Sequence, residues 1–363
     1  MKPSKLLFIV AIAASLFLSS GATRAAEPGV YMLFVWGTAT SGVRDGIEIS
    51  EKKLEAAFDA AGLTPSSRFV KGCKTLKGSD ATGPKILSAC REMADAAGPN
   101  DAVLVYILAV GATLEEPDGR LRYVLAPCAS SPSDLQLKSH GIARARIMTT
   151  LKSKPHRLNV VVTDVSSVST EPSSVAYAAR SQNESISDSD SGFDGESGSA
   201  PSASDPYLLH FLLKARGNLD VNSTRPENDS SRGEAAMGFA PAEWTRVPSD
   251  PDKRRDYENY AGTVFTNAFI QTAGTSEFDA DFDCSVDAFF QKLKARLNSS
   301  YAATKDYLKE TGQISAFVVF MRQETQTLTK FDDDGFPIQD DGSPYRVRHD
   351  KHEDGPADDG FYL

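Results

Sequence analysis

Long apolar runs are scarce in this sequence, and the only extended one lies at the start, in residues 6–18. Two lysines precede it and Thr23-Arg24-Ala25 follows it, which is the basic, apolar and small-residue order of a secretory signal peptide. The run is shorter than the roughly 20 residues that a permanent membrane helix needs. We therefore expect cleavage after residues 1–25, no stable membrane span thereafter, and an exported protein, periplasmic or extracellular. A retained N-terminal anchor is the alternative.

Basic residues are also in the minority. The chain of 363 residues has 39 lysines and arginines against 49 aspartates and glutamates, a formal net charge of -10. Binding to a nucleic-acid backbone requires a basic surface, which this composition does not supply. We expect no nucleic-acid partner.

Residues of the kind that hold metals are few and scattered. The four cysteines form no CxxC pair and the five histidines do not cluster around them, so we expect no metal and no cofactor. Aspartates 332–334 lack the alternating spacing of a calcium loop. In an exported protein the cysteines can form disulfides, for example Cys73 with Cys90 across a short loop. In a domain of this size they can equally remain free, buried thiols.

Three short, continuous apolar runs predict strands that are buried on both faces, at residues 30–37, 101–108 and 158–163. Helical periodicity lies between and before them, in residues 50–61, 85–97 and 142–151, with Ser50 as the expected N-cap of the first helix and Gly62 as its stop. Alternation of this kind is typical of an α/β fold with a mostly parallel sheet covered by helices on both faces. Sites in such sheets form where the strands end, at their C-terminal edge.

The organisation along the chain follows from composition. Residues 181–206 are rich in Ser, Asp and Gly and too poor in apolar side chains to offset the entropy of ordering, which predicts a disordered surface loop. Apolar elements resume at residue 207 and continue to about residue 331. Residues 332–363 read as a solvated acidic tail.

Two of the strand ends resemble those of bacterial caspase-like and metacaspase-like peptidases, the clan of caspase-fold cysteine peptidases. Residues 101–111 resemble the family strand that ends in Tyr-Ser-Gly-His-Gly-Ala, with Val110 where the histidine belongs. Residues 163–167, Thr-Asp-Val-Ser-Ser, resemble the nucleophile segment, with Ser166 where the cysteine belongs. The separation of Val110 and Ser166 agrees with the roughly 50 residues between histidine and cysteine in caspases.

Further segments resemble the family in the same order, at residues 213–223, 233–235, 262–268 and 323–331. The resemblance implies a three-layer caspase-like domain. Its large-subunit-like part would be residues 28–180 and its small-subunit-like part residues 207–331, on the same sheet.

The two substitutions remove the chemistry that the resemblance implies. Valine cannot take up a proton, and serine is a weak nucleophile at neutral pH without a base. We therefore expect a degenerate member, a pseudo-peptidase that acts by binding a peptide or protein partner. The alternatives are an active hydrolase with a rebuilt site at Ser166, for which His140 is the least poor base, and an inert secreted scaffold.

The last hypothesis concerns Asp164 as a residue that binds the peptide. In metacaspases the aspartate two residues before the cysteine lines the pocket for a basic P1 side chain, so the resemblance implies a preference for basic peptides. The alternative is that Asp164 caps the turn after the strand.

Overall fold

The computed structural model of the protein describes residues 27–39, 44–115, 121–128, 141–167, 207–223, 249–274, 284–311, 330–331, 337–338 and 342–343. The predictions for the signal peptide, the 181–206 loop and most of the acidic tail concern residues outside these ranges. In the described part of the chain, no helix combines the length and the apolar character needed to cross a membrane.

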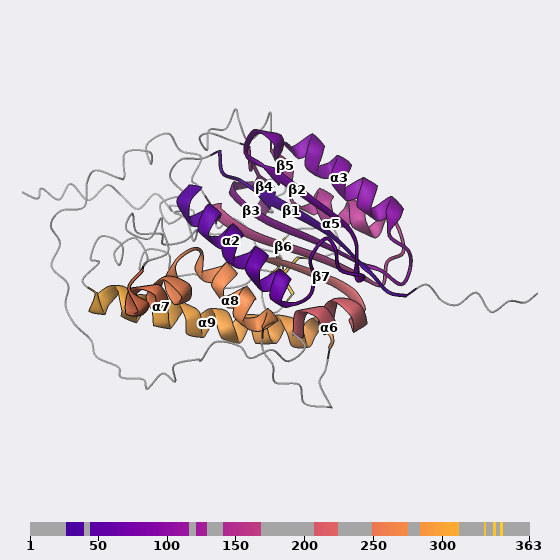
Figure 1. The fold of residues 1–363 in the computed structure, drawn as a ribbon. Helices are drawn as coiled ribbons and strands as arrows, with labels where there is room; N and C mark the ends of the chain where they lie inside the picture. Colours follow the sequence, from indigo (N-terminus) through magenta and orange to yellow (C-terminus); the bar gives the residue numbers. More distant parts are fainter. Residues whose placement is uncertain are drawn as a thin grey trace, which may run out of the picture.

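The centre of the molecule is a mostly parallel sheet, as the alternating pattern predicted (Figure 1). Five strands run parallel in the order β2-β1-β3-β6-β7. Their bounds are β1 Val30–Trp36, β2 Val70–Lys77, β3 Ala102–Glu115, β6 Leu158–Ser167 and β7 Gly217–Asn222. The three apolar runs became β1, β3 and β6, which are buried because helices cover both of their faces.

The sheet is extended beyond the end of β1 by an antiparallel ladder. β3 continues to Glu115 and pairs there with β4 (Leu121–Leu125), which pairs in turn with the short β5 (Ile142–Ala143). The β3–β4 pair is antiparallel over Gly111–Glu115 and Leu121–Leu125. A separate pair of two-residue strands, β8 (Lys330–Phe331) and β9 (Pro337–Ile338), lies beside β7.

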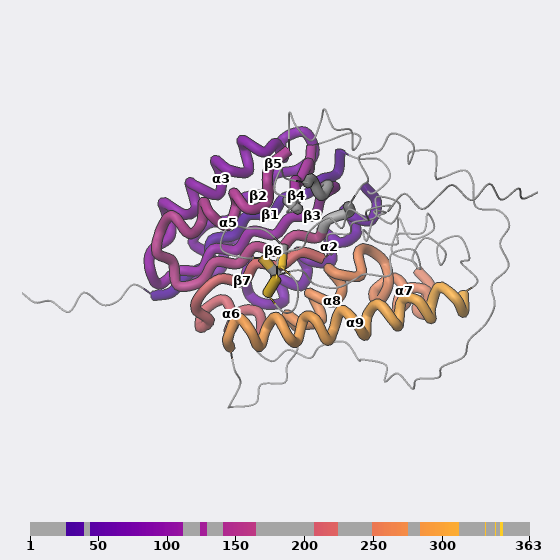
Figure 2. The backbone as a smooth tube through the Cα atoms, turned by 180° about the vertical axis from the view of Figure 1, so that it is seen from behind, coloured from indigo at the N-terminus to yellow at the C-terminus, as the bar shows by residue number. Residues whose placement is uncertain are grey.

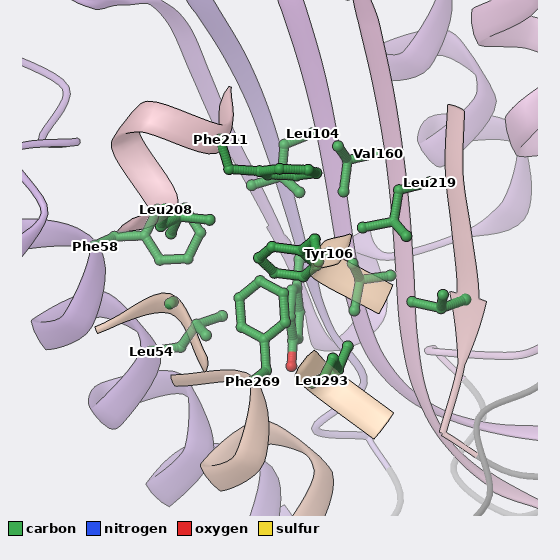
Figure 3. Close-up of a cluster of buried hydrophobic side chains, with 14 of the residues drawn as sticks. Leu54, Phe58, Leu104, Tyr106, Val160, Leu208, Phe211, Leu219, Phe269 and Leu293 are labelled. Carbon is green, nitrogen blue, oxygen red and sulfur yellow. The ribbon is translucent and has the colours of Figure 1, made fainter. Parts of the chain in front are cut away.

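One face of the sheet is covered by α2, α6, α8 and α9 (Figures 1 and 2). Their bounds are α2 Arg44–Ala60, α6 Tyr207–Lys214, α8 Val264–Ala273 and α9 Val286–Glu310. Aromatic rings from these helices meet the sheet at Tyr106, and the core of this layer also includes Phe58, Phe211 and Phe269 (Figure 3). The segment after residue 206 thus supplies both a strand of the sheet and most of one helical layer.

The other face is covered by α3 (Gly83–Ala96) and α5 (Ala145–Lys152), giving three layers in all (Figure 1). Thr82 caps α3 by accepting from the Lys85 N–H, and Pro84 stands in its first turn, where its missing N–H costs nothing. Residues 142–143 were expected in the helix but belong to β5, because they complete the edge of the antiparallel ladder.

The start of α2 differs from the expectation. The helix begins at Arg44, so Ser50 lies inside it and is 1% exposed. Serine favours N-caps because its hydroxyl competes for backbone groups. Here the Ser50 hydroxyl instead accepts a hydrogen bond from the Thr263 N–H at 2.8 Å, a tertiary partner that sequence pattern does not reveal. The predicted stop is confirmed, since Gly62 follows the helix with a φ of 67°.

The outermost strand β2 carries three lysines, and each is held by a carboxylate. Lys71 pairs with Asp101 at 2.6 Å, Lys74 with Glu92 at 2.9 Å and Lys77 with Glu51 at 2.6 Å. These acids come from a loop and from the helices α3 and α2, so the edge of the sheet is tied to both layers.

Candidate functional site

The two positions that resemble a catalytic dyad are neighbours in the sheet. β3 and β6 are parallel and adjacent, and their register places Val110 opposite Ser166. Both lie toward the C-terminal end of the parallel ladder, at the edge where sites form in such sheets. Val110 is 1% exposed, and its carbonyl accepts from the Ala126 N–H at 2.9 Å. The sequence alone therefore identified two positions that are neighbours in the structure. The strand was expected to end near Val110, but β3 continues to Glu115 and pairs there with β4.

Two histidines, His156 and His210, lie in the described residues. His156 precedes β6, at the opposite end of the strand from Ser166, and its ring nitrogens are bonded to Asn159 Oδ1 at 2.9 Å and to the Ala94 carbonyl at 3.0 Å. His210 lies in α6, the helix that precedes β7. His140, His349 and His352 lie outside the described residues.

Asp164 is the charged group nearest in sequence to Ser166, and it is wholly buried. Its carboxylate oxygen Oδ2 accepts from the hydroxyl of Thr263 and from that of Thr266, the latter at 2.9 Å. Thr263 is the N-cap of α8 and also accepts from the Thr266 N–H at 3.0 Å. The carboxylate thus fastens β6 to the first turn of α8.

The surroundings raise the pKa of Asp164 from its ordinary 3.8 to about 6. Burial is the largest cause, and hydrogen bonds from Thr263, Thr266 and Ser223 offset only part of it. Tyr106 of β3 completes the cluster, with its hydroxyl 3.0 Å from Thr266 Oγ1, and burial raises its pKa well above 10. The sequence identified Asp164 but not its enclosure, because its hydroxyl partners lie about a hundred residues further along the chain.

The junction between α7 (Pro251–Tyr260) and α8 is held from α2 as well. Lys53 Nζ donates to the Ala261 carbonyl and to Asn267 Oδ1, both at 2.7 Å. Burial lowers the pKa of Lys53 to about 7, against the opposing effect of Glu258. Gly262 has a φ of 90°, and a Cβ there would lie 2.7 Å from Ser50 Oγ, so this turn requires glycine.

A second polar cluster lies on the opposite face of β6. Arg144 is 0% exposed; its Nε donates to Thr163 Oγ1 and its Nη2 to the Val221 carbonyl, both at 2.7 Å. Its Nη1 pairs with Asp220 of β7. The ring of Phe331 covers the guanidinium, 3.8 Å from ring centroid to Cζ. Sequence reasoning missed this pair, since neither residue stands in a recognisable motif.

The four cysteines lie in the described residues and none of them is disulfide-bonded, so the disulfide Cys73–Cys90 is not present. Cys90 is buried in the α3 layer, and burial raises its pKa to about 12, which makes the thiol inert. Within the described ranges no three His, Cys, Asp or Glu residues are grouped closely enough to hold a metal ion.

Together, the fold and these clusters define a three-layer α/β domain whose candidate site is the C-terminal edge of β3 and β6. No known family model matches the chain, and no curated protein matches it. Solved structures do. Protein GSU0716 from Geobacter sulfurreducens matches with a TM-score of 0.27 and 18% identity, over 39% of this chain and 51% of that one. The chain therefore spans about half the length of that protein.

Caspase-1 from Spodoptera frugiperda also matches, with a TM-score of 0.33 and 12% identity, over 74% of this chain and 76% of that one. At these TM-scores neither likeness establishes a family or an activity for this chain.

Proposed function

We propose that this chain is an exported caspase-like domain that has lost peptidase activity and acts by binding a peptide or protein partner. The observation that carries the proposal is the register of Val110 and Ser166 on adjacent strands. Two residues at the positions of a base and a nucleophile lie side by side, and the one at the base position is a buried hydrocarbon. A hydroxyl without a neighbouring base is too weak a nucleophile for peptide cleavage at neutral pH.

The competing proposal, a rebuilt serine hydrolase, requires a base within about 3 Å of the nucleophile. Within the described residues the histidine closest in sequence to Ser166 is His156, which is held at the other end of β6.

We expect no turnover of peptide substrates with basic, acidic or neutral P1 residues, and no change in the Ser166→Ala variant. Loss of the members of a catalytic triad costs on the order of a millionfold in turnover in a serine protease, which places residual cleavage below detection. The measurement is release of a fluorogenic leaving group by the purified mature protein. Cleavage that disappears in Ser166→Ala, and persists in Ser88→Ala as the control, would establish the hydrolase instead.

A narrower proposal concerns the partner. The resemblance to metacaspases implies that Asp164 contacts a basic side chain, but its carboxylate is enclosed by Thr263 and Thr266. A guanidinium would have to displace these hydroxyls in order to form an ion pair with the carboxylate.

If a basic side chain does reach Asp164, the Asp164→Asn variant should bind Arg-containing peptides about 10-fold more weakly, as expected for loss of one charged hydrogen bond. Calorimetry measures this, with citrulline in place of arginine as the neutral peptide control and Asp95→Asn as the matched surface variant. Because the contact would be enclosed, affinity should depend only weakly on salt. Equal affinity of the native protein and Asp164→Asn would leave Asp164 as an interior residue of the fold, and absence of binding to either would favour an inert scaffold.

A further inference from the structure

The start of α8 covers the carboxylate of Asp164. The hydroxyls of Thr263 and Thr266 both donate to Asp164 Oδ2, and the residue is 0% exposed. Access to this oxygen from outside requires that these hydroxyls move away from β6. The contacts that hold the start of α8 in place therefore decide whether Asp164 is accessible.

Two side chains of α2 hold the turn that leads into α8. The Ser50 hydroxyl accepts from the Thr263 N–H at 2.8 Å. Lys53 Nζ donates to the Ala261 carbonyl and to Asn267 Oδ1, both at 2.7 Å. Ser50 and Lys53 are three positions apart, so they lie on the same side of the helix. Both ends of the turn, residues 261 and 263, are thus bonded to α2.

Gly262 lies between these two bonded residues and brings the backbone close to α2. Its φ is 90°, and a Cβ at this position would lie 2.7 Å from Ser50 Oγ. The turn therefore packs directly against the Ser50 side chain, and its position depends on that side chain.

α7, which precedes the turn, has few buried contacts of its own. Among residues 251–260 only Tyr257 is buried, and it forms a small cluster with Ile49 and Ala261, separate from the two main cores. Tyr260 adds a stacking contact with Tyr307 of α9, with ring centroids 4.2 Å apart. Segments with few buried apolar contacts open locally at a low free energy. α7 and the turn can therefore move without disrupting the main cores.

We propose that α7 and residues 261–263 form a movable cover over Asp164, which Ser50 and Lys53 of α2 hold closed. When the cover opens, the Thr263 hydroxyl leaves the carboxylate and Asp164 becomes accessible to solvent. The cover is a property of the fold and does not depend on peptide binding. If Asp164 binds a basic side chain, as proposed above, opening of the cover has to precede that contact.

The first measurement is hydrogen exchange of the Thr263 amide in Lys53→Met, followed by NMR. Lys53 does not bond to this N–H, so faster exchange would show that the turn opens as a unit. Loss of a hydrogen bond from a charged group corresponds to about 10- to 100-fold faster exchange. Lys52→Met, at the exposed neighbouring position of α2, should leave the rate unchanged. The amide of Val105 in β3 should keep its rate in both variants, because the opening is local.

The second measurement is the exposure of Asp164 itself, by carbodiimide coupling of glycine ethyl ester and mass spectrometry. We expect modification of Asp164 to be about 10-fold or more faster in Lys53→Met than in the native protein, in line with the amide exchange. Ser50→Ala should accelerate it as well, whereas Lys52→Met should not. Asp95, which is 65% exposed, should react equally in all four proteins.

Three results would overturn the proposal. The first is an unchanged exchange rate of the Thr263 amide in Lys53→Met. The second is unchanged modification of Asp164 when that amide does exchange faster. The third is equal acceleration at Val105, which would mean that Lys53 stabilises the whole fold rather than a cover. Neither measurement uses a peptide, so a failure of peptide binding is distinguished from a failure of this proposal.

Discussion

Asp220→Ala is expected to lower the free energy of unfolding by about 3–5 kcal/mol, the usual cost of removing one partner of a buried ion pair. Arg144 is 0% exposed and would retain its bonds to Thr163 and Val221, but it would lose its ion pair with Asp220. Urea denaturation followed by circular dichroism measures the effect. The structure offers a surface pair as a control: Lys154 and Asp95 are 52% and 65% exposed, and Asp95→Ala should cost less than about 1 kcal/mol.

The double variant Arg144→Met/Asp220→Leu distinguishes charge from packing. Replacing both members of a buried pair by apolar groups of similar volume is often neutral or stabilising. We expect it to recover most of the stability lost in Asp220→Ala. A double variant as unstable as the single one would mean that the hydrogen bonds of Arg144 to β6 and β7, rather than the charge balance, hold this face of the sheet.

Phe289→Ala is expected to cost about 3–5 kcal/mol as well, the range for removing a buried phenylalanine. Phe289 of α9 is 1% exposed and stacks on Phe211 of α6, with ring centroids 4.3 Å apart. Its ring also lies 5.6 Å from Tyr207 and 5.9 Å from Phe269 of α8. The side chain therefore joins three helices of one layer above the sheet.

This variant also tests the domain organisation. If residues 28–180 and 207–331 form one domain, the Phe289→Ala protein should unfold in a single transition shifted to lower urea, with far-UV and tryptophan signals coinciding. Trp36 reports from β1, on the other side of the proposed boundary, once the second tryptophan is removed in a Trp244→Phe background. Gln291→Ala, on the exposed side of α9, should change stability by no more than about 0.5 kcal/mol. Two separated transitions would show two domains.

The central strands could be predicted because the apolar pattern of each one lies within a few consecutive residues. β1, β3 and β6 are continuous apolar runs, which are typical of strands buried on both faces in a parallel sheet. The pairing of Val110 with Ser166 was predictable for the same reason, since both follow such runs. The start of α2 was not, because the hydroxyl of Ser50 is satisfied by Thr263, more than two hundred residues away.

The environment of Asp164 could not be inferred for a related reason. Its position near the end of β6 suggested a carboxylate open to a ligand, yet the first turn of α8 covers it. The sequence shows on which strand and near which end a side chain lies. Whether that side chain is exposed to solvent depends on elements that follow later in the chain. The same limit applies to Arg144, whose contacts include Asp220 of β7 and the ring of Phe331, both later in the chain.

The three paired lysines of β2 also affect whether a strand of a second chain can add to this edge of the sheet. An outer strand is a template on which another chain can add itself, and natural proteins discourage this by placing lysine there. At Lys71, Lys74 and Lys77 an incoming strand would have to disturb contacts with Asp101, Glu92 and Glu51 and desolvate ammonium groups. The paired lysines thereby oppose the addition of a second chain at this end of the sheet.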